Sequence, residues 1–455
     1  MNKRNLAMLS LAALFATAPV VFAQAPAPAQ AEIAPVAEPA PSTPAEMPVS
    51  APVATKQELE TKPATEVKPT LEVKQEPAKA ASGMKISIYG FFQLNGVYET
   101  GANGGRIWSI WVPKNAQDGE GRILLNVNQT RIGLNVAGEQ KESGPEASGK
   151  FEIDFANNNE RNNNGVGSLR IRHAFGQAKF NDIGLSILFG QTQDLIAPLT
   201  APTINQGTLQ GEGSLGTRRP MIRLAEVVGP VEIAAAVTDN RDATAPVLPA
   251  FQGSVKAKIP ASWAGAKQNI EFILSGHYAS REVAAEDTAG ITKKDTSKAL
   301  PASWSGVASL SLPVINIINL SGEFFLGQNL WSYSSGTIQQ TNAVAKDGKG
   351  VKSLGGWGAA TIKLPADFAL AGGYGVEAID KDREPVAVGT SVAPARIKNS
   401  VIFANLKYFI DESMFVGFEY ANLSTEYVDN TGVERIAFGG GKLNRFELVF
   451  NYAFK

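Results

Sequence analysis

The sequence predicts an all-β protein: a 16-stranded antiparallel transmembrane β-barrel with an inward-folded loop after the fifth strand, preceded by a disordered Pro/Ala-rich segment. Three observations lead to this prediction. From Lys85 onward, short segments alternate apolar and polar residues and are separated by glycine-containing turns. The connections between these segments alternate between long and short, which is typical of an outer-membrane barrel. The last segment carries an apolar, mostly aromatic stripe on every second residue from Phe446 to Phe454.

Two regions precede the barrel. Residues 1–23 have the pattern of a secretory signal peptide, because Lys3 and Arg4 come before an apolar stretch and a small-x-small cleavage site ends at Ala23. Residues 24–83 are rich in Ala, Pro, Glu and Lys and lack aromatic residues, so they bury too little apolar surface to fold. We expect a disordered periplasmic tether there, and a contact of this tether with the cell wall stays open. Residues 84–455 form the expected barrel domain in the bacterial outer membrane.

The composition argues against several other classes of protein. The chain has no cysteine and two histidines, which excludes a disulfide framework and a thiol nucleophile and leaves little room for metal chemistry. No run of 18 apolar residues follows the signal, so a membrane span has to be a closed barrel with paired backbone groups. The net charge of −1 gives no reason to expect nucleic acid as a partner. We expect no catalytic residue, no metal site and no cofactor.

The expected strands follow from period-2 alternation bounded by turn residues. The alternation is clearest in KISIYGFFQLNGVYE at 85–99 and in KFEID at 150–154. The connections 192–217, 280–302 and 328–352 are long, whereas 181–182, 229 and 411–412 are tight. The sixteen strands are expected at 85–99, 122–137, 148–158, 168–180, 183–191, 218–228, 230–239, 251–260, 268–279, 303–313, 317–327, 353–364, 367–378, 396–410, 413–426 and 443–454.

The terminal strand is expected to close the barrel against the first strand. Its aromatic stripe then faces outer-membrane lipid or lipopolysaccharide, and its polar face lines water. The outer-membrane assembly machinery is understood to read such a terminal stripe, so it is an expected partner. Here Lys455 follows Phe454 and ends the chain.

Arginines recur on the faces expected to point into the barrel. Arg131 lies opposite the apolar face of its strand, and Arg170 and Arg172 share a face in LRIRHAF. A guanidinium stays charged and binds carboxylate or phosphate through a planar fork, so a lumen lined in this way favours anions. The alternative is that these arginines pair with Glu152 and Asp154 or simply fill the lumen.

A second group of arginines opens the strand expected at 218–228. Arg219 and Arg223 share a face there, and Arg218 stands at the strand entry. Because neighbouring strands lie about 4.8 Å apart, arginines on the second, fourth and sixth strands can form one basic flank inside the wall.

The connection at 192–217 is expected to fold into the barrel and narrow it. It is too apolar for a loop that is exposed throughout (Leu195, Ile196, Leu199, Ile204). Asp194 and Glu212 would then face the arginine flank and produce a transverse field at a constriction. A loop that covers the rim is the alternative.

The two histidines are expected in different environments. His277 is expected to be a solvated residue on the lumen side. His173 falls on the apolar side of its strand, where either a subunit interface or a bulge explains it.

One run of the chain resembles the DcaP-like porins, within the broader type of 16-stranded trimeric porins. The run is LRIRHAFGQAKF…LSILFGQTQDLIAPL…GSLGTRRPMIRL, and the resemblance is clearest over about 85–225. It implies a homotrimeric channel that takes up dicarboxylates and similar small anions, with a role for the matching arginines.

The leading functional hypothesis is therefore a passive diffusion porin for small hydrophilic solutes, with a preference for small anions. The alternative is a structural barrel with little or no conductance, which tethers the membrane through residues 24–83. An outer-membrane phospholipase would need a nucleophile and a base close together, and no Ser follows either His by two residues, so the chain has no His-x-Ser pair. We therefore expect no enzyme.

Overall fold

The computed structural model describes most of the expected barrel domain. The described residues are 83–102, 107–108, 110–114, 121–139, 144–157, 168–241, 248–264, 268–286, 292–334, 344–345, 349–380, 385–386, 395–428 and 437–455. The expected signal peptide and all of the expected tether before Gly83 lie outside these residues. Among the described residues, no helix has the length and apolar character needed to cross a membrane.

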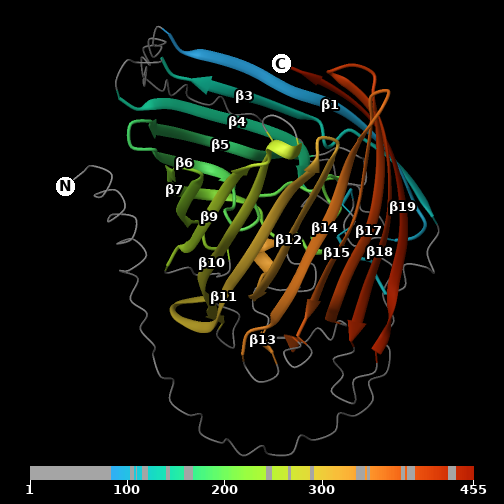
Figure 1. The fold of residues 1–455 in the computed structure, drawn as a ribbon. Helices are drawn as coiled ribbons and strands as arrows, with labels where there is room; N and C mark the ends of the chain where they lie inside the picture. Colours follow the sequence, from blue (N-terminus) through green and yellow to red (C-terminus); the bar gives the residue numbers. More distant parts are fainter. Residues whose placement is uncertain are drawn as a thin grey trace, which may run out of the picture. The chain divides into compact units, whose positions relative to one another are not determined.

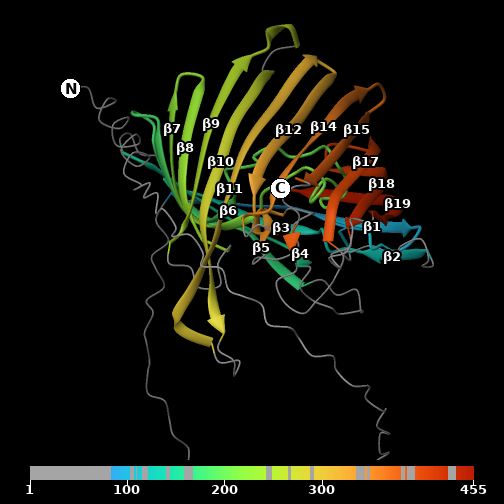
Figure 2. The ribbon, with the colours of Figure 1, turned by 90° about the horizontal axis from the view of Figure 1, so that it is seen from below.

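Sixteen antiparallel strands close into a barrel, as the sequence predicts (Figures 1 and 2). Strand β1 (Lys85–Glu99) pairs with the last strand, β19 (Ala437–Phe454), and so closes the sheet. The second barrel strand is split into β2 (Arg122–Asn126) and β3 (Arg131–Ala137), which both pair with β1. The wall continues through β4 (Glu146–Asn157), β5 (Ser168–Phe180), β6 (Leu185–Gln193), β7 (Arg218–Val228), β8 (Val231–Thr238), β9 (Ala250–Pro260), β10 (Asn269–Glu286), β11 (Thr292–Ile315), β12 (Ile318–Gln328), β14 (Lys352–Leu364), β15 (Phe368–Ile379), β17 (Ala395–Phe409) and β18 (Met414–Val428).

Short elements complete the fold. The 3-10 turns of the described residues are η2 (Ser262–Ala264) and η3 (Trp331–Tyr333). Strands β13 (Val344–Ala345) and β16 (Pro385–Val386) pair in a separate two-stranded sheet. Both lie in long connections of the wall, at the rim opposite the tight turns.

The outer face of the barrel is apolar and the inner face is polar. On β19, Leu448, Phe450 and Tyr452 are exposed, whereas the intervening Glu447 and Asn451 are buried on the inside. The terminal stripe packs against β1, where the rings of Phe92 and Phe454 are 5.2 Å apart. A continuous exposed apolar surface of this kind is what a lipid-facing barrel wall requires.

The prediction of a loop at 280–302 is wrong in its extent. Strand β10 runs on to Glu286 and β11 begins at Thr292, so only 287–291 separate the two strands. Their ladder continues to the pair of Glu286 and Thr292, with irregularities after Ala279 and Ala284. The clean apolar–polar alternation stops where an extended hairpin leaves a lipid-facing wall, so sequence periodicity misses this part.

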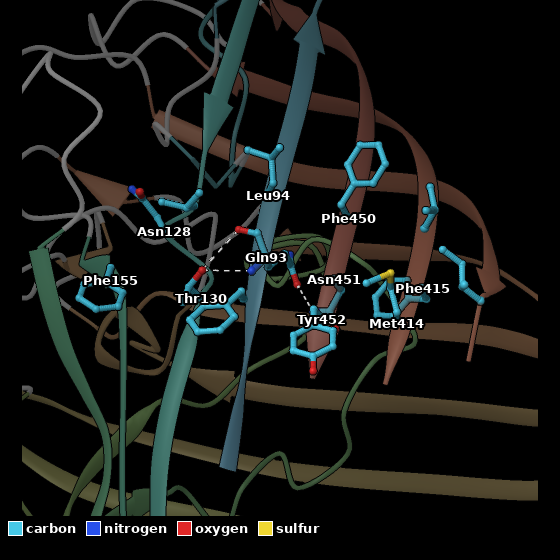
Figure 3. A pocket seen from close by; sticks show the side chains of 14 residues that line it. Gln93, Leu94, Asn128, Thr130, Phe155, Met414, Phe415, Phe450, Asn451 and Tyr452 are labelled. Carbon is cyan, nitrogen blue, oxygen red and sulfur yellow. Dashed lines mark hydrogen bonds between the residues drawn. The ribbon is translucent and has the colours of Figure 1, made fainter. Parts of the chain in front are cut away.

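The split of the second strand opens a groove in the wall. Residues Phe92 to Leu94 of β1 have no ladder partner on that side, because β2 pairs only from Asn95 and β3 only up to Phe91. The side chain of Thr130 fills the gap, and its Oγ1 accepts a 3.1 Å hydrogen bond from the Gln93 backbone N–H. The resulting groove has a volume of about 900 Å³. Figure 3 shows side chains that line it, most of them apolar and on the outer face (Leu94, Phe155, Met414, Phe450, Tyr452).

Candidate functional site

The segment 194–217 between β6 and β7 folds into the barrel, as expected from its apolar residues (Figure 2). Ile196 and Leu209 are fully buried in it. Its tip touches the opposite wall through glycines: a Cβ on Gly213 would lie 2.2 Å from the Gly356 carbonyl oxygen, and one on Gly375 would lie 2.1 Å from the Glu212 carbonyl oxygen. Gly213 has a φ of +115°, which favours glycine. The segment, called the constriction loop below, therefore crosses the lumen.

A buried ion pair clamps the two ends of the constriction loop. Asp194 Oδ1 lies 3.0 Å from Arg219 Nε, and both side chains are fully buried. Asp194 Oδ2 accepts hydrogen bonds from the backbone N–H and the hydroxyl of Thr217, at 2.8 and 3.0 Å. The Arg219 guanidinium also lies 4.0 Å above the ring of Tyr333. Asp194 and Arg219 thus hold the loop and are shielded from the lumen.

Carboxylates of the opposite wall receive the loop. Glu419 on β18 accepts hydrogen bonds from the Ile204 backbone N–H at 2.5 Å and from the Thr208 hydroxyl at 2.9 Å. Glu447 on β19 accepts one from Asn205 Nδ2 at 2.8 Å. Glu323 on β12 binds the Trp357 indole N–H at 2.8 Å and a loop N–H at 3.3 Å. The acids of this wall are buried by the loop that they bind.

Glu212 does not contribute to the transverse field that we expected. Its side chain is fully buried at the tip of the constriction loop, where Asn399 Nδ2 lies 3.4 Å from its Oε1. Burial, followed by the neighbouring carboxyl group of Glu377, raises the pKa of Glu212 well above its ordinary range. Because Glu212 and Asp194 are both enclosed, the expectation that they face the arginines across the pore is corrected.

A β-bulge brings Arg172 and His173 to the same face of β5. The register of β4 and β5 shifts between the pairs Glu152–His173 and Ile153–Ile171, which leaves Arg172 as the extra residue. His173 lies within 3.0 Å of the Thr192 hydroxyl on the inner side. Of the two explanations offered for His173, the bulge is the one that the structure contains.

Arg170 and Arg172 bind the two carboxylates of β4. Arg170 forms a bidentate pair with Asp154, at 2.8 and 2.6 Å. Arg172 donates to Glu152 at 2.6 Å and to Asp154 at 2.8 Å. The pairing that was the alternative reading is therefore present, and it fixes the guanidinium groups in position.

Cations outnumber acids around the narrow part of the lumen. A cavity of about 670 Å³ lies between the arginine wall and the constriction loop, and among the described residues that line it Glu152 is the one acidic side chain. Arg218 and Lys407 form no ion pair with a described residue. In the part of the chain that the structure describes, six cations line the cavity: Arg131, Lys150, Arg170, Arg172, Arg218 and Lys407.

Two of these cations were not singled out as site residues from the sequence. Lys150 shares its face with Glu152 and Asp154, so the alternation contained a signal for it. Lys407 lies on β17, far along the chain, and only the closure of the barrel brings it to the cavity. Arg223, in contrast, is on β7 but is not part of the lining, and its electrostatic neighbour is Glu232.

A second segment also folds inward and was not expected. Between β1 and β2, residues 107–108 and 110–114 lie along the inner wall, where Tyr427 donates a 2.6 Å hydrogen bond to the Val112 carbonyl oxygen. The Val112 N–H donates to the Thr425 hydroxyl at 2.8 Å. Trp108 of this segment lines the cavity, 5.7 Å from the Arg170 guanidinium.

His277 has a structural role in the wall. His277 is buried, stacks on Tyr333 at 3.7 Å and lies within hydrogen-bonding distance of Ser303 and Ser305, so the expectation of a solvated side chain is corrected. No cluster of three or more His, Cys, Asp or Glu suited to a metal occurs among the described residues.

The fold is similar to those of solved outer-membrane channels. The outer membrane channel DcaP of Acinetobacter baumannii aligns with a TM-score of 0.64 and 20% identity, over 83% of this chain and 99% of that one. An anion-selective porin from Comamonas acidovorans aligns with a TM-score of 0.54 and 11% identity, over 82% of this chain and 100% of that one. OmpT of Vibrio cholerae in its trimer form aligns with a TM-score of 0.50 and 11% identity, over 82% of this chain and 100% of that one.

These likenesses establish the fold. No protein-family model matches the chain, and no curated protein sequence matches it. The chain has the fold of the 16-stranded porins, and the resemblance to DcaP-like porins seen in the sequence is confirmed as a likeness of fold.

Proposed function

We propose that the protein is an outer-membrane porin, a passive diffusion channel for small hydrophilic solutes that favours small anions of the dicarboxylate type. The observation that carries the proposal is the excess of cations around the cavity at the constriction loop. Six described Lys and Arg side chains line it, and the described carboxylates beside them are Glu152 and Asp154. A water-filled lumen with such a ring attracts anions and repels cations.

The burial of the opposite acids supports this charge balance. Glu419 and Glu447 are 2% and 1% exposed, and their oxygens accept hydrogen bonds from the constriction loop. In this arrangement they do not offer a path for cations along the far wall. The field in the narrow region is then dominated by the arginine wall and by Lys407.

The proposal extends to the partners. A homotrimer is proposed because the fold is shared with OmpT, which is described in a trimer form. The exposed apolar outer face suits outer-membrane lipid and lipopolysaccharide, and the terminal stripe of β19 suits recognition by the assembly machinery. Periplasmic placement of residues 24–83 remains part of the same proposal.

Charge substitution at the constriction tests the proposal. We choose Arg218→Gln with Lys407→Gln, because neither cation forms an ion pair with a described residue and their removal leaves no carboxylate without its partner. The double variant should fold normally and lower the anion-to-cation permeability ratio in a planar bilayer under a salt gradient. Arg223→Gln is the matched control, since it removes a lumen-face arginine outside the cavity.

Each result has a clear meaning. An unchanged ratio in the double variant, or an equal loss in Arg223→Gln, would contradict the assignment of selectivity to this cavity. A correctly folded wild-type barrel without conductance would instead support the tethering alternative.

A further inference from the structure

We propose a second binding site on the long-loop side of the constriction, for a small anion that carries a flat apolar face. The site is a cavity of about 440 Å³ formed around Arg396, Trp111, Trp331 and Tyr427. Ile110, Gln210 and Ser334 complete its lining. None of these residues belongs to the arginine wall described above, and only Gln210 is shared with the lining of the constriction cavity.

Arg396 is a buried cation without a carboxylate of its own. Its side chain is 6% exposed, and it forms no hydrogen bond or ion pair with any residue that the structure describes. The described acidic groups that face it are Glu377 on β15 and the Tyr427 phenol on β18, and neither forms an ion pair with it. A buried charge without a hydrogen-bonding partner is unfavourable, and a bound anion would remove that penalty.

Other buried arginines of the barrel are satisfied differently. Arg172 pairs with Glu152 and Asp154, and Arg219 pairs with Asp194. Arg445 pairs with Glu447 at 3.1 Å. Against this pattern, the guanidinium of Arg396 is held by stacking, with its Cζ 4.1 Å from the centre of the Trp111 ring. Stacking occupies a face of the guanidinium and leaves its N–H edge for an anion.

Two of the aromatic walls, Trp111 and Tyr427, are positioned by hydrogen bonds of their segments. Trp111 lies between Ile110, whose carbonyl oxygen accepts a hydrogen bond from Asn399, and Val112, which is bonded to Thr425 and Tyr427. Tyr427 is also the register partner of Arg396 across β17 and β18. A group of two indoles, a phenol ring and a guanidinium suits a planar anion, because ring contact and charge act on the same ligand.

The position of the site relates it to permeation. Gln210 of the constriction loop lines both cavities, so the site lies next to the constriction cavity and its arginine wall. The site would therefore hold an aromatic anion at the mouth of the narrow region before it passes. This inference rests on the proposed function only in that the ligand reaches the site through the lumen.

Two probes with the same charged group separate ring recognition from charge alone. Benzenesulfonate and methanesulfonate both stay ionised, and only the first has a flat apolar face. Full-length protein in detergent is titrated with each probe, and tryptophan fluorescence reports binding because Trp111 and Trp331 are two of the six tryptophans. We expect saturable binding of benzenesulfonate, and at least about tenfold weaker binding of methanesulfonate, a difference of about 1.4 kcal/mol.

Variants locate the binding. Arg396→Gln should weaken benzenesulfonate binding by about tenfold or more, since it removes a charge-assisted contact. Trp331→Ala provides a second variant, because this side chain is 40% exposed and its loss should not disturb folding. It should also weaken binding, whereas the constriction variant Arg218→Gln with Lys407→Gln should leave the affinity unchanged.

Contrary outcomes are distinguishable. Equal affinity for the two sulfonates, or undiminished binding in both Arg396→Gln and Trp331→Ala, would overturn the site. Loss of binding in the constriction variant alone would place the ligand at the arginine wall and would also overturn it. These binding results are independent of the reversal potential of the wild-type channel, which tests the proposed function separately.

Discussion

At the scale of single residues, the constriction depends on which charges have partners. Arg170 and Arg172 share Asp154, which is fully buried at their centre. Lys407 has no such partner among the described residues and contacts the ring of Phe415, 5.6 Å away. The paired arginines are therefore fixed in space, and the cations without a pairing carboxylate add net charge.

Substitution of Asp154 distinguishes the structural role of the paired charges from their effect on net charge in the lumen. Asp154→Asn leaves two guanidinium groups without a shared carboxylate, and breaking a buried pair typically destabilises a protein by about 3–5 kcal/mol. We expect a lower unfolding midpoint in denaturant and, for the folded fraction, a stronger anion preference. Asp239→Asn is the control, since Asp239 pairs with Arg241 at an exposed site. Its effect should stay within about 0.5 kcal/mol, and a comparable loss in both variants would contradict this account.

The raised pKa of Glu212 predicts that the stability of the folded protein falls as the pH rises. Burial and Glu377 raise its pKa in the folded state, so the folded protein holds this proton more tightly than the unfolded chain does. Its contribution to stability is complete below the ordinary carboxyl pKa and is lost as the pH rises through the raised value. Thermal unfolding in detergent, followed from about pH 4 to about pH 8, should show a midpoint that falls with pH. Glu212→Gln should flatten this fall, and an equal slope in wild type and variant would count against it.

At the scale of elements, specific contacts hold the constriction loop against the barrel wall. Its inward course was predictable, because Leu195, Ile196 and Leu199 have no place on an exposed loop. Its partners were not predictable, since Glu323, Glu419 and Gly375 lie far along the chain and no local pattern connects them with it. The bulge at Arg172 and the inward segment around Trp111 depend in the same way on contacts that only the closed barrel creates.

Two glycines of the wall form a matched pair for testing that contact. A Cβ on Gly375 would lie 2.1 Å from the Glu212 carbonyl oxygen, whereas a Cβ on Gly358, in the neighbouring strand β14, meets nothing within 4 Å. Gly375→Ala should displace the loop tip, increase the current noise of single channels and cost about 1–3 kcal/mol of stability. Gly358→Ala should leave both unchanged. Quiet, wild-type channels in Gly375→Ala would show that the loop is not held at this point.

At the scale of the whole molecule, the alternation of residues and of loop lengths predicts the barrel because both are repeated along the chain. The closure of β1 against β19 and the exposed aromatic face of β19 follow from the same period. Sequence reasoning fails where lipid no longer imposes that period, as in the extension of β10 and β11. It also fails for the charge balance in the lumen, which depends on which acids the constriction loop buries.

The reversal potential of the wild-type channel in a potassium chloride gradient tests the central claim most directly. Purified protein is inserted into a planar bilayer, and the potential at zero current is measured across the gradient. The cation excess around the constriction cavity predicts a potential that favours chloride. A potential that favours potassium would mean that the acids of the lumen govern permeation, and it would contradict the proposed anion preference.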